Sequence, residues 1–378
     1  MKKIVRTITG DSPGKTTQLV YFKLGSEQAE KKVYLQAALH ADEQPGILVL
    51  HHLLKLLEQA EAQGLLKARL VVFPMVNPLG MGDIGFRQHQ GRYDRASGVN
   101  FNRNWPDLFK AIHTKLANQL GDNAAHNIQL VRAAVKDWLK QQQPVNALQQ
   151  QRQCVMQEAF DADYVLDLHC DNEALPHIFS VPQSAQVMQD LSDWMGAAAT
   201  LFAEDSGGYS FDEVWSNVWL DLAKAYPDKA IPLACHSATL EYRGQFDTFD
   251  ALNQEDAERL YGFLQSQALI GGELIRPRPV ATPAGTDLAA TEMTRVQQAG
   301  LLAYKVQLGD TVKKGDVLAD LIALDGEGAF VERLPVLAGT DGVLISRNIH
   351  KYVWPGCSIA KIVGKEKLES RGEYLLED

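Results

Sequence analysis

The stretch KVYLQAALHADEQPGILVLHHLLKLL, residues 32–57, decides the fold of this chain. Its first part is a continuous apolar run, which predicts a buried strand that ends at His40. A short acidic turn and Pro45-Gly46 follow, and proline is favourable at a helix start because its missing N–H would be unpaired there. The apolar residues beyond it recur at helical spacing and predict an amphipathic helix: Ile47, Leu50, Leu54 and Leu57.

Similar segments continue the pattern along the chain. Short apolar runs predict further strands at 70–76 (LVVFPMV), 164–168 (YVLDL) and 238–242 (ATLEY). Helical periodicity covers 107–160, broken near Gly121, and also 252–270, whereas residues 79–106 are rich in Gly, Arg, Asn and Asp and predict a long functional loop. Strands that alternate with helices indicate an α/β fold.

The composition changes near residue 271. Residues 271–286 are rich in proline and glycine, so we predict a catalytic domain over 1–275, a linker over 276–286 and a second domain over 287–378. An internal repeat lies in the second domain, with an offset of 41–42 residues: Gly300-Leu301-Leu302 matches Gly342-Val343-Leu344, and Leu318-Ala319 matches Ile359-Ala360. Two β-rich copies predict a small all-β module that resembles the barrel-sandwich fold of biotinyl and lipoyl domains. Because the tripeptide that carries the prosthetic group is absent, we expect a structural or lid role.

Composition and charge exclude several classes of protein. The 378 residues are 46% hydrophobic and 22% charged, which is typical of a globular chain, and the net charge of −10 argues against nucleic-acid binding. No apolar run is long enough for a membrane span, so we expect none. The N-terminal residues lack the apolar core of a secretory signal and the four cysteines are far apart, so we expect a cytoplasmic protein with reduced thiols.

Polar side chains at the predicted strand ends suggest a metal site. His40 and Glu43 follow one strand and His169 follows another, and such ends are where open α/β sheets bind ligands. Two histidines and one glutamate are a ligand set of catalytic zinc, with a fourth position left for water. Asp167 lies two residues before His169, on the same side of the strand, and is predicted to orient a ligand.

Other candidate residues lie in the long loop and at a later strand end. Four arginines (Arg87, Arg92, Arg95 and Arg103) give the loop a basic character that favours an anionic partner. Glu241 ends the strand at 238–242, where a buried carboxylate is costly unless it is paired or functional. His177 is a candidate for the wall of a substrate pocket.

Taken together, these segments resemble the succinylglutamate desuccinylase/aspartoacylase family of the zinc carboxypeptidase superfamily. The resemblance rests on four motifs in order: HADE at 40–43, RYDRASGVNFNR at 92–103, DLH at 167–169 and TLE at 239–241. It implies a zinc-carboxypeptidase-like α/β/α sandwich with a mixed sheet, followed by a small β-domain.

The resemblance also implies roles for individual residues. His40, Glu43 and His169 would hold one zinc ion, and Glu241 would be the general base and acid. Arg92 would polarise the scissile carbonyl, with Arg87 and Arg95 as alternatives. Asn102 and Arg103 would bind a substrate carboxylate, with Arg87 and His177 as further substrate-binding candidates.

The predicted function is therefore zinc-dependent hydrolysis of an amide bond in a small N-acyl amino acid or a related carboxylate. Two alternatives stay open: a metallocarboxypeptidase that acts on short peptides, and a binding protein of the same fold without activity. Three acids near the metal motif (Asp42, Asp171 and Glu173) suggest in addition that the substrate carries a cationic group. The sequence leaves the oligomeric state open, including a homo-oligomer.

Overall fold

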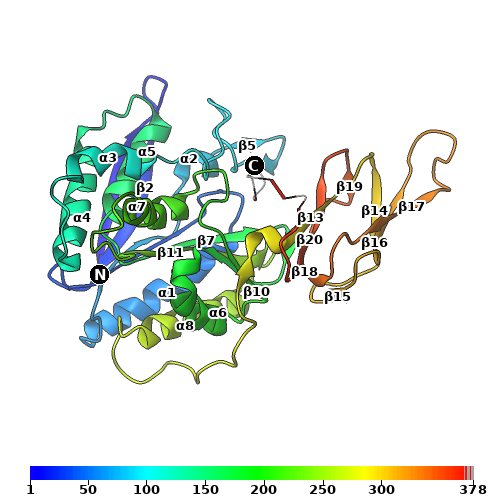
Figure 1. Ribbon diagram of the computed structural model, residues 1–378. Coiled ribbons are helices and arrows are strands. Elements are labelled where there is room, and N and C mark those ends of the chain that lie inside the picture. Colours follow the sequence, from blue (N-terminus) through cyan, green and yellow to red (C-terminus); the bar gives the residue numbers. More distant parts are fainter. Residues whose placement is uncertain (370, 373–374, 376–378) are drawn as a thin grey trace.

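A mixed sheet lies at the centre of the molecule (Figure 1). The structure is a computed structural model that describes residues 1–369, 371–372 and 375, and within these residues nine strands form this sheet, in the order β1-β2-β4-β3-β7-β11-β9-β10-β12. The strands are β1 (Lys2–Thr9), β2 (Thr16–Leu24), β3 (Lys32–Ala37), β4 (Arg69–Phe73), β7 (Tyr164–Asp171), β9 (His177–Ser180), β10 (Ala199–Phe202), β11 (His236–Gly244) and β12 (Thr286–Asp287).

The central strands bring their carboxyl ends to one edge of the sheet. β3 pairs parallel with both β4 and β7, and β11 pairs parallel with β7, whereas β9 runs antiparallel to β11. In this register Glu241 lies opposite His169, and Thr239 lies opposite Asp167. The residues that follow or end β3, β7 and β11 therefore meet in space, although more than 200 residues separate His40 from Glu241 along the chain.

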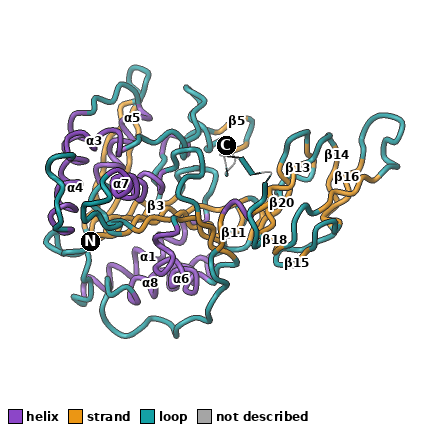
Figure 2. The backbone as a smooth tube through the Cα atoms, viewed as in Figure 1, coloured by secondary structure: helices purple, strands orange, loops and turns teal. Residues whose placement is uncertain are grey.

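Helices cover both faces of the sheet, as Figures 1 and 2 show. The helices are α1 (Pro45–Ala62), α2 (Pro78–Met81), α3 (Leu108–Leu116), α4 (Ala124–Gln141), α5 (Ala147–Ala159), α6 (Ala185–Met195), α7 (Phe211–Ala225) and α8 (Asp250–Ser266). One core lies under α3, α4, α5 and α7 and the other under α1, α6 and α8. Successive residues of β7 alternate between them, since Val165 joins the first core and Leu166 the second. The predicted α/β/α sandwich with a mixed sheet is confirmed.

The C-terminal residues form two further sheets within the described part of the chain. One contains β13 (Thr291–Arg295), β20 (Ser358–Val363), β18 (Gly342–Arg347) and β15 (Thr311–Val312), and the other contains β17 (Arg333–Leu337), β16 (Val317–Ile322), β14 (Gly300–Tyr304) and β19 (Tyr352–Val353). Leucine, isoleucine and alanine side chains from both sheets share one core, so the pair is a sandwich. Strands β14, β15 and β16 recur as β18, β19 and β20 at the offset of the sequence repeat. We call residues 287–369 the β-module.

Contacts join the β-module to the large sheet. β8 (Glu173–Ala174), just after β7, pairs antiparallel with β18 of the module. Arg347 and Lys351 of the module form ion pairs with Glu173, and Lys361 forms one with Asp171. The module thus lies beside the edge of the sheet that carries His169 and Glu241.

Some elements carry no clear sequence signal. Strand β1 of the hairpin is largely exposed, and both β1 and β2 mix polar with apolar residues, so hydrophobic periodicity does not reveal the hairpin. The long loop contains α2 and the short strands β5 (Ile84–Gly85) and β6 (Gln88–His89). None of the described helices combines the length and the apolar character that crossing a membrane requires.

Candidate active site and metal centre

The turn between β3 and α1 places two of the predicted ligands. Ala38 adopts the left-handed region with φ of 57°, which turns the chain sharply as it leaves the strand. His40 and Glu43 follow and are both buried. Gly46 lets α1 approach the sheet, because a Cβ there would lie 3.0 Å from Cβ of Leu168 and 3.1 Å from Cβ of Ala37.

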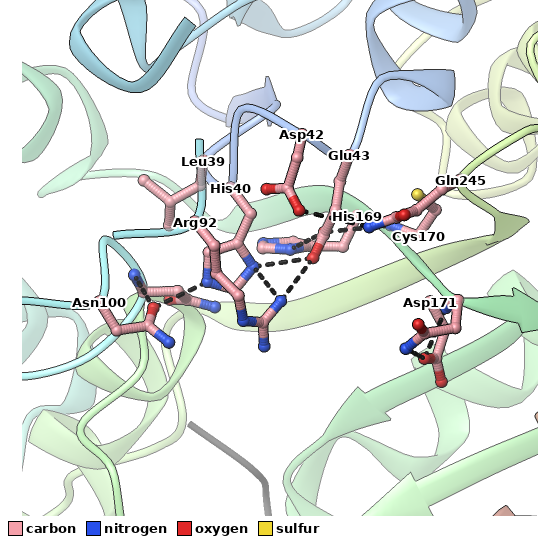
Figure 3. Close-up of polar contacts among 12 residues, drawn as sticks. Leu39, His40, Asp42, Glu43, Arg92, Asn100, His169, Cys170, Asp171 and Gln245 are labelled. Atoms are coloured by element: carbon pink, nitrogen blue, oxygen red, sulfur yellow. Dashed lines mark hydrogen bonds and ion pairs between the residues drawn. The ribbon is translucent and has the colours of Figure 1, made fainter. Parts of the chain in front are cut away.

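His169, at the end of β7, meets these two residues (Figure 3). Nδ1 of His40 lies 2.9 Å from Oε1 of Glu43, and Nδ1 of His169 lies 2.7 Å from Oε2 of the same carboxylate. One ligand atom from each of the three residues lies within 4.8 Å of the other two. The three side chains can therefore share one metal ion.

The remaining nitrogen of each imidazole contacts a polar group. Nε2 of His40 lies 2.8 Å from Oδ1 of Asn100, and Nε2 of His169 lies 3.0 Å from Oδ2 of Asp167. Such contacts orient the rings of metal-binding histidines and leave the other nitrogen for the metal. The donor set and its supporting contacts thus fit a zinc ion bound through Nδ1 of both histidines and the carboxylate of Glu43.

The pKa values of Glu43, His40 and His169 show how the three side chains could bind a metal cation. Burial opposes ionisation of Glu43, but His40 and His169 hold the pKa of its carboxyl well below the usual value. Burial and the charge of Arg92 lower the pKa of His40. Burial lowers the pKa of His169, but Asp167 and Glu43 outweigh it and raise that pKa well above the usual value. A metal that binds Nδ1 of His169 would therefore displace a proton.

The long loop supplies the cationic side of the site. Gly91 passes close to the HADE turn: a Cβ on Gly91 would lie 2.7 Å from Cβ of Ala41, and its carbonyl accepts a 2.8 Å hydrogen bond from the Ala41 N–H. This contact puts Nη1 of Arg92 3.0 Å from Oε1 of Glu43 (Figure 3). Further along, Oδ1 of Asn102 accepts a 2.8 Å hydrogen bond from the Phe211 N–H, which fixes the Asn102 amide beside the first residue of α7.

Glu241 reaches the same site from β11. Its register places it opposite His169, and its Oε2 atom is buried without a hydrogen-bond partner among the described residues. Burial and the nearby carboxylate of Glu43 raise the pKa of Glu241 to about 8. A carboxyl group of this kind can exchange a proton near neutral pH.

One cavity of about 280 Å³ contains all of these groups. His40, Glu43 and His169 line it together with Glu241, Arg92, Asn102 and Arg103. Apolar residues line it as well, among them Phe179 and Leu201. Leu288 and Lys361, which follow the predicted linker, also contribute to the wall.

Three sequence candidates lie outside this cavity. Arg87 is exposed in the turn between β5 and β6, and Arg95 forms a 2.9 Å exposed ion pair with Asp83, so Arg92 alone of the three arginine candidates reaches the metal ligands. His177 is fully buried under the sheet edge, where its Nδ1 donates to the Leu175 carbonyl. Burial lowers its pKa to about 4, so it stays neutral. The structure therefore places Arg87 and His177 outside the cavity, and their substrate-binding roles stay predictions.

Other residues at the site carry no predictive signal of their own. Lys361 and Asp212 lie in elements without a motif, and only the folded chain brings them to the cavity. Asn100 contacts His40 from the long loop. The sequence does offer a signal for Asn100, because this residue lies two positions before Asn102 in the motif at 92–103.

Comparisons with known proteins agree with the geometry. Residues 29–205 match the model described as the succinylglutamate desuccinylase/aspartoacylase catalytic domain. No curated protein sequence matches the chain.

Solved structures of similar fold span almost the whole chain. A protein of this family from Shewanella amazonensis SB2B is 24% identical, with a TM-score of 0.83, and the match covers 96% of this chain and 98% of that one. A second, from Shewanella frigidimarina NCIMB 400, is 21% identical with a TM-score of 0.84, covering 96% and 97%. The ectoine utilization protein EutE from Ruegeria pomeroyi is 17% identical with a TM-score of 0.65, covering 96% and 94%. At these identities the likeness establishes the fold.

The family model covers the HADE turn, the arginine-rich loop and the DLH strand end, and the last of the four motifs, at Glu241, completes the same cavity. Residues 29–205 of the chain are therefore similar in sequence to the catalytic domain of the succinylglutamate desuccinylase/aspartoacylase family.

Proposed function

We propose that this protein is a zinc-dependent deacylase that hydrolyses the amide bond of a small N-acyl amino acid. The observation that carries the proposal is the convergence of the His40, Glu43 and His169 ligand atoms within 4.8 Å, in the cavity that also holds Glu241 and Arg92. When bound there, zinc would act as a Lewis acid and make water nucleophilic near neutral pH.

Side chains of the cavity carry out the other parts of the reaction. Glu241 accepts the proton of the attacking water and returns it to the leaving amine, a role that its position opposite His169 in the cavity wall supports. The guanidinium of Arg92, within 3.0 Å of a metal ligand, donates to the carbonyl oxygen as negative charge develops on it. Asn102 and Arg103 hold the carboxylate of the substrate.

The size of the cavity supports a small substrate. Its volume of about 280 Å³ is just below the usual range for small-molecule sites, which runs from about 300 to 1,000 Å³. Leu288 and Lys361 add to its wall from beyond the predicted linker and restrict its length. A short acyl group on a single amino acid fits these limits better than a peptide does.

The test is an assay of zinc-loaded protein on N-acetyl and N-succinyl amino acids, their methyl esters and short peptides. We expect cleavage of the free acids and at least tenfold slower cleavage of the esters, because the esters cannot pair with Arg103. A preference for peptides would support the metallocarboxypeptidase instead. Failure to cleave any amide with zinc bound would support a binding protein.

A further inference from the structure

We propose that Asp212 selects the amino-acid half of the substrate, and that this half carries a cationic side chain, as in lysine, ornithine or arginine. The inference rests on the proposed deacylase function and names the substrate class for that site. It assigns a specificity role to a residue of α7 that lies outside the four sequence motifs.

Asp212 lies in the cavity wall next to the proposed carboxylate site. It is the second residue of α7, is only 6% exposed and lines the cavity. The preceding residue, Phe211, donates its N–H to Asn102, and Ser237 of β11 donates its hydroxyl to the Asp212 carbonyl at 2.7 Å. Asp212 is therefore held between Asn102 and β11, on the side of the cavity where the amino acid's carboxylate binds.

The charge of Asp212 has no cationic partner in the described structure. Three other acids of the cavity wall are compensated: Glu43 by Arg92, Asp171 by Lys361, and Glu213 by the N–H groups of Ser206 and Ser210. Asp212 accepts one hydrogen bond, from the Ser210 hydroxyl at 2.7 Å, and forms no ion pair among the described residues.

Burial without a cationic partner raises the free energy of an ionised carboxylate, and the pKa of Asp212 reflects this. Burial and the neighbouring charge of Glu213 raise the pKa of Asp212 to about 6. A buried charge is normally paired, so a cation supplied by the ligand would complete this part of the cavity.

The surroundings suit a side chain with an apolar stem and a charged end. Thr239 of β11 and Phe179 of β9 are paired in register and lie one row below Glu241, about 7 Å along the strand. Both line the cavity on the sheet face that α7 covers. The methylenes of lysine or arginine can lie along Phe179 while the charge reaches Asp212.

The structure also changes which acids favour a cationic substrate. The sequence drew attention to Asp42, Asp171 and Glu173. Lys361 neutralises Asp171, and Arg347 and Lys351 neutralise Glu173. Asp42 lines the cavity beside the proposed metal ligands and accepts a 3.3 Å hydrogen bond from Gln245. Asp212, which no sequence motif marks, is a further acid of the cavity wall without an ion pair among the described residues, and it lies on the α7 side of the cavity.

Two measurements on the zinc-loaded protein test the proposal. The first compares kcat/KM for N-acyl-lysine and N-acyl-norleucine with the same acyl group, since norleucine keeps the stem and lacks the ammonium. The second measures binding of the free products, L-lysine and L-norleucine, by calorimetry, and needs no turnover. We expect wild type to favour lysine in both by about 10- to 100-fold, the range of a charged hydrogen bond.

Two variants test whether the preference for lysine depends on Asp212. Asp212→Asn keeps the shape and an acceptor for Ser210, and should bring the lysine-to-norleucine ratio close to one. Asp221→Asn, in the same helix but outside the cavity, should leave the ratio unchanged.

The outcomes separate the two proposals. Amide hydrolysis without preference for lysine would overturn the Asp212 assignment and leave the deacylase function intact. Lysine binding that depends on Asp212 without hydrolysis of any amide would support the assignment and count against the deacylase. Equal binding of lysine and norleucine by wild type would overturn the assignment even if Asp212→Asn fails to fold.

Discussion

Glu241 lies opposite His169 in the strand pairing but has a role separable from that of the proposed metal ligands, and this can be tested at the scale of one residue. Glu241→Gln removes the proton-carrying group and keeps its shape, while His40, Glu43 and His169 remain. We expect kcat to fall about 10²- to 10⁴-fold, the usual contribution of a general acid–base group. Turnover at saturating substrate measures the loss, and elemental analysis should find zinc unchanged. Activity within a few-fold of wild type would exclude Glu241 as the base.

Arg103 allows a second test at this scale. It is buried, its Nη1 donates to the Asn102 carbonyl at 2.9 Å, and it lines the cavity. Arg103→Ala should raise KM and lower kcat/KM for an N-acyl amino acid by about 10- to 150-fold, the equivalent of a charged hydrogen bond. Steady-state kinetics with the free acid and its methyl ester measure the effect, and the variant should no longer distinguish the two substrates.

A matched control lies in the same loop. Arg95 is exposed and paired with Asp83, so Arg95→Ala should change kcat/KM by no more than a few-fold. If both variants lose activity equally, the effect comes from the charge of the loop and the carboxylate assignment of Arg103 is wrong.

At the scale of elements, the metal site depends on how closely α1 packs on the sheet. A Cβ on Gly46 would approach Cβ of Leu168, Cβ of Ala37 and the Leu168 carbonyl, all within 3.1 Å. These atoms belong to buried strands and cannot move aside easily. Gly46→Ala should therefore lower the free energy of unfolding by about 1–3 kcal/mol, as overpacking does, and weaken zinc binding because Glu43 lies just before the helix.

Urea denaturation and a zinc titration measure the two effects of Gly46→Ala. Gly121→Ala is the control, because a Cβ there meets no atom within 4 Å, and we expect a change of no more than about 0.5 kcal/mol. If Gly46→Ala is as stable as wild type and binds zinc equally well, close packing of α1 does not hold the HADE turn.

At the scale of the whole molecule, Lys361 links the β-module to the catalytic part. Its Nζ lies 2.5 Å from Oδ2 of Asp171, and both side chains are largely buried. Burial alone would raise the pKa of Asp171, but the charge of Lys361 outweighs it and holds that pKa well below the usual value. Lys361→Met leaves a buried carboxylate uncompensated, which we expect to cost about 3–5 kcal/mol near pH 7.

The pH dependence of the stability lost in Lys361→Met follows from the direction in which folding shifts the pKa of Asp171. A carboxyl whose pKa is lowered by folding stabilises the folded state above its unfolded pKa of about 3.9, and the gain is lost as the pH falls below it. Because the unfolded state is the same in both proteins, the difference in unfolding free energy between wild type and Lys361→Met depends on the two folded-state pKa values of Asp171. Burial raises this pKa in the variant, so the difference should be largest at pH values above the raised pKa and shrink as the pH falls below it. Thermal unfolding across this range measures it.

A surface pair in the same module provides the comparison. Lys305 pairs with Asp320 at 3.0 Å but is about half exposed, so Lys305→Met should cost no more than about 1 kcal/mol. A Lys361→Met cost as small as that of Lys305→Met would show that the Asp171 pair does not hold the module in place.

The sequence by itself determined the elements and motifs that depend on neighbouring residues. The apolar run into His40 and the helical spacing after Pro45 sufficed for β3 and α1, because periodicity and helix-start chemistry are local. The order of the four motifs indicated the family and His40, Glu43 and His169 as the ligand set, and the repeat in the C-terminal part indicated β-strands.

Only the tertiary structure decided which distant groups share the cavity. Lys361 and Asp212 belong to elements with no motif, and His177 follows a motif strand and lies opposite Glu241 yet does not line the cavity. The reason is physical: strand register, helix packing and the position of the β-module set these distances, and each depends on contacts between residues far apart in the chain. Local patterns therefore predicted the ligands of the proposed metal, whereas long-range packing determines which residues would recognise the substrate.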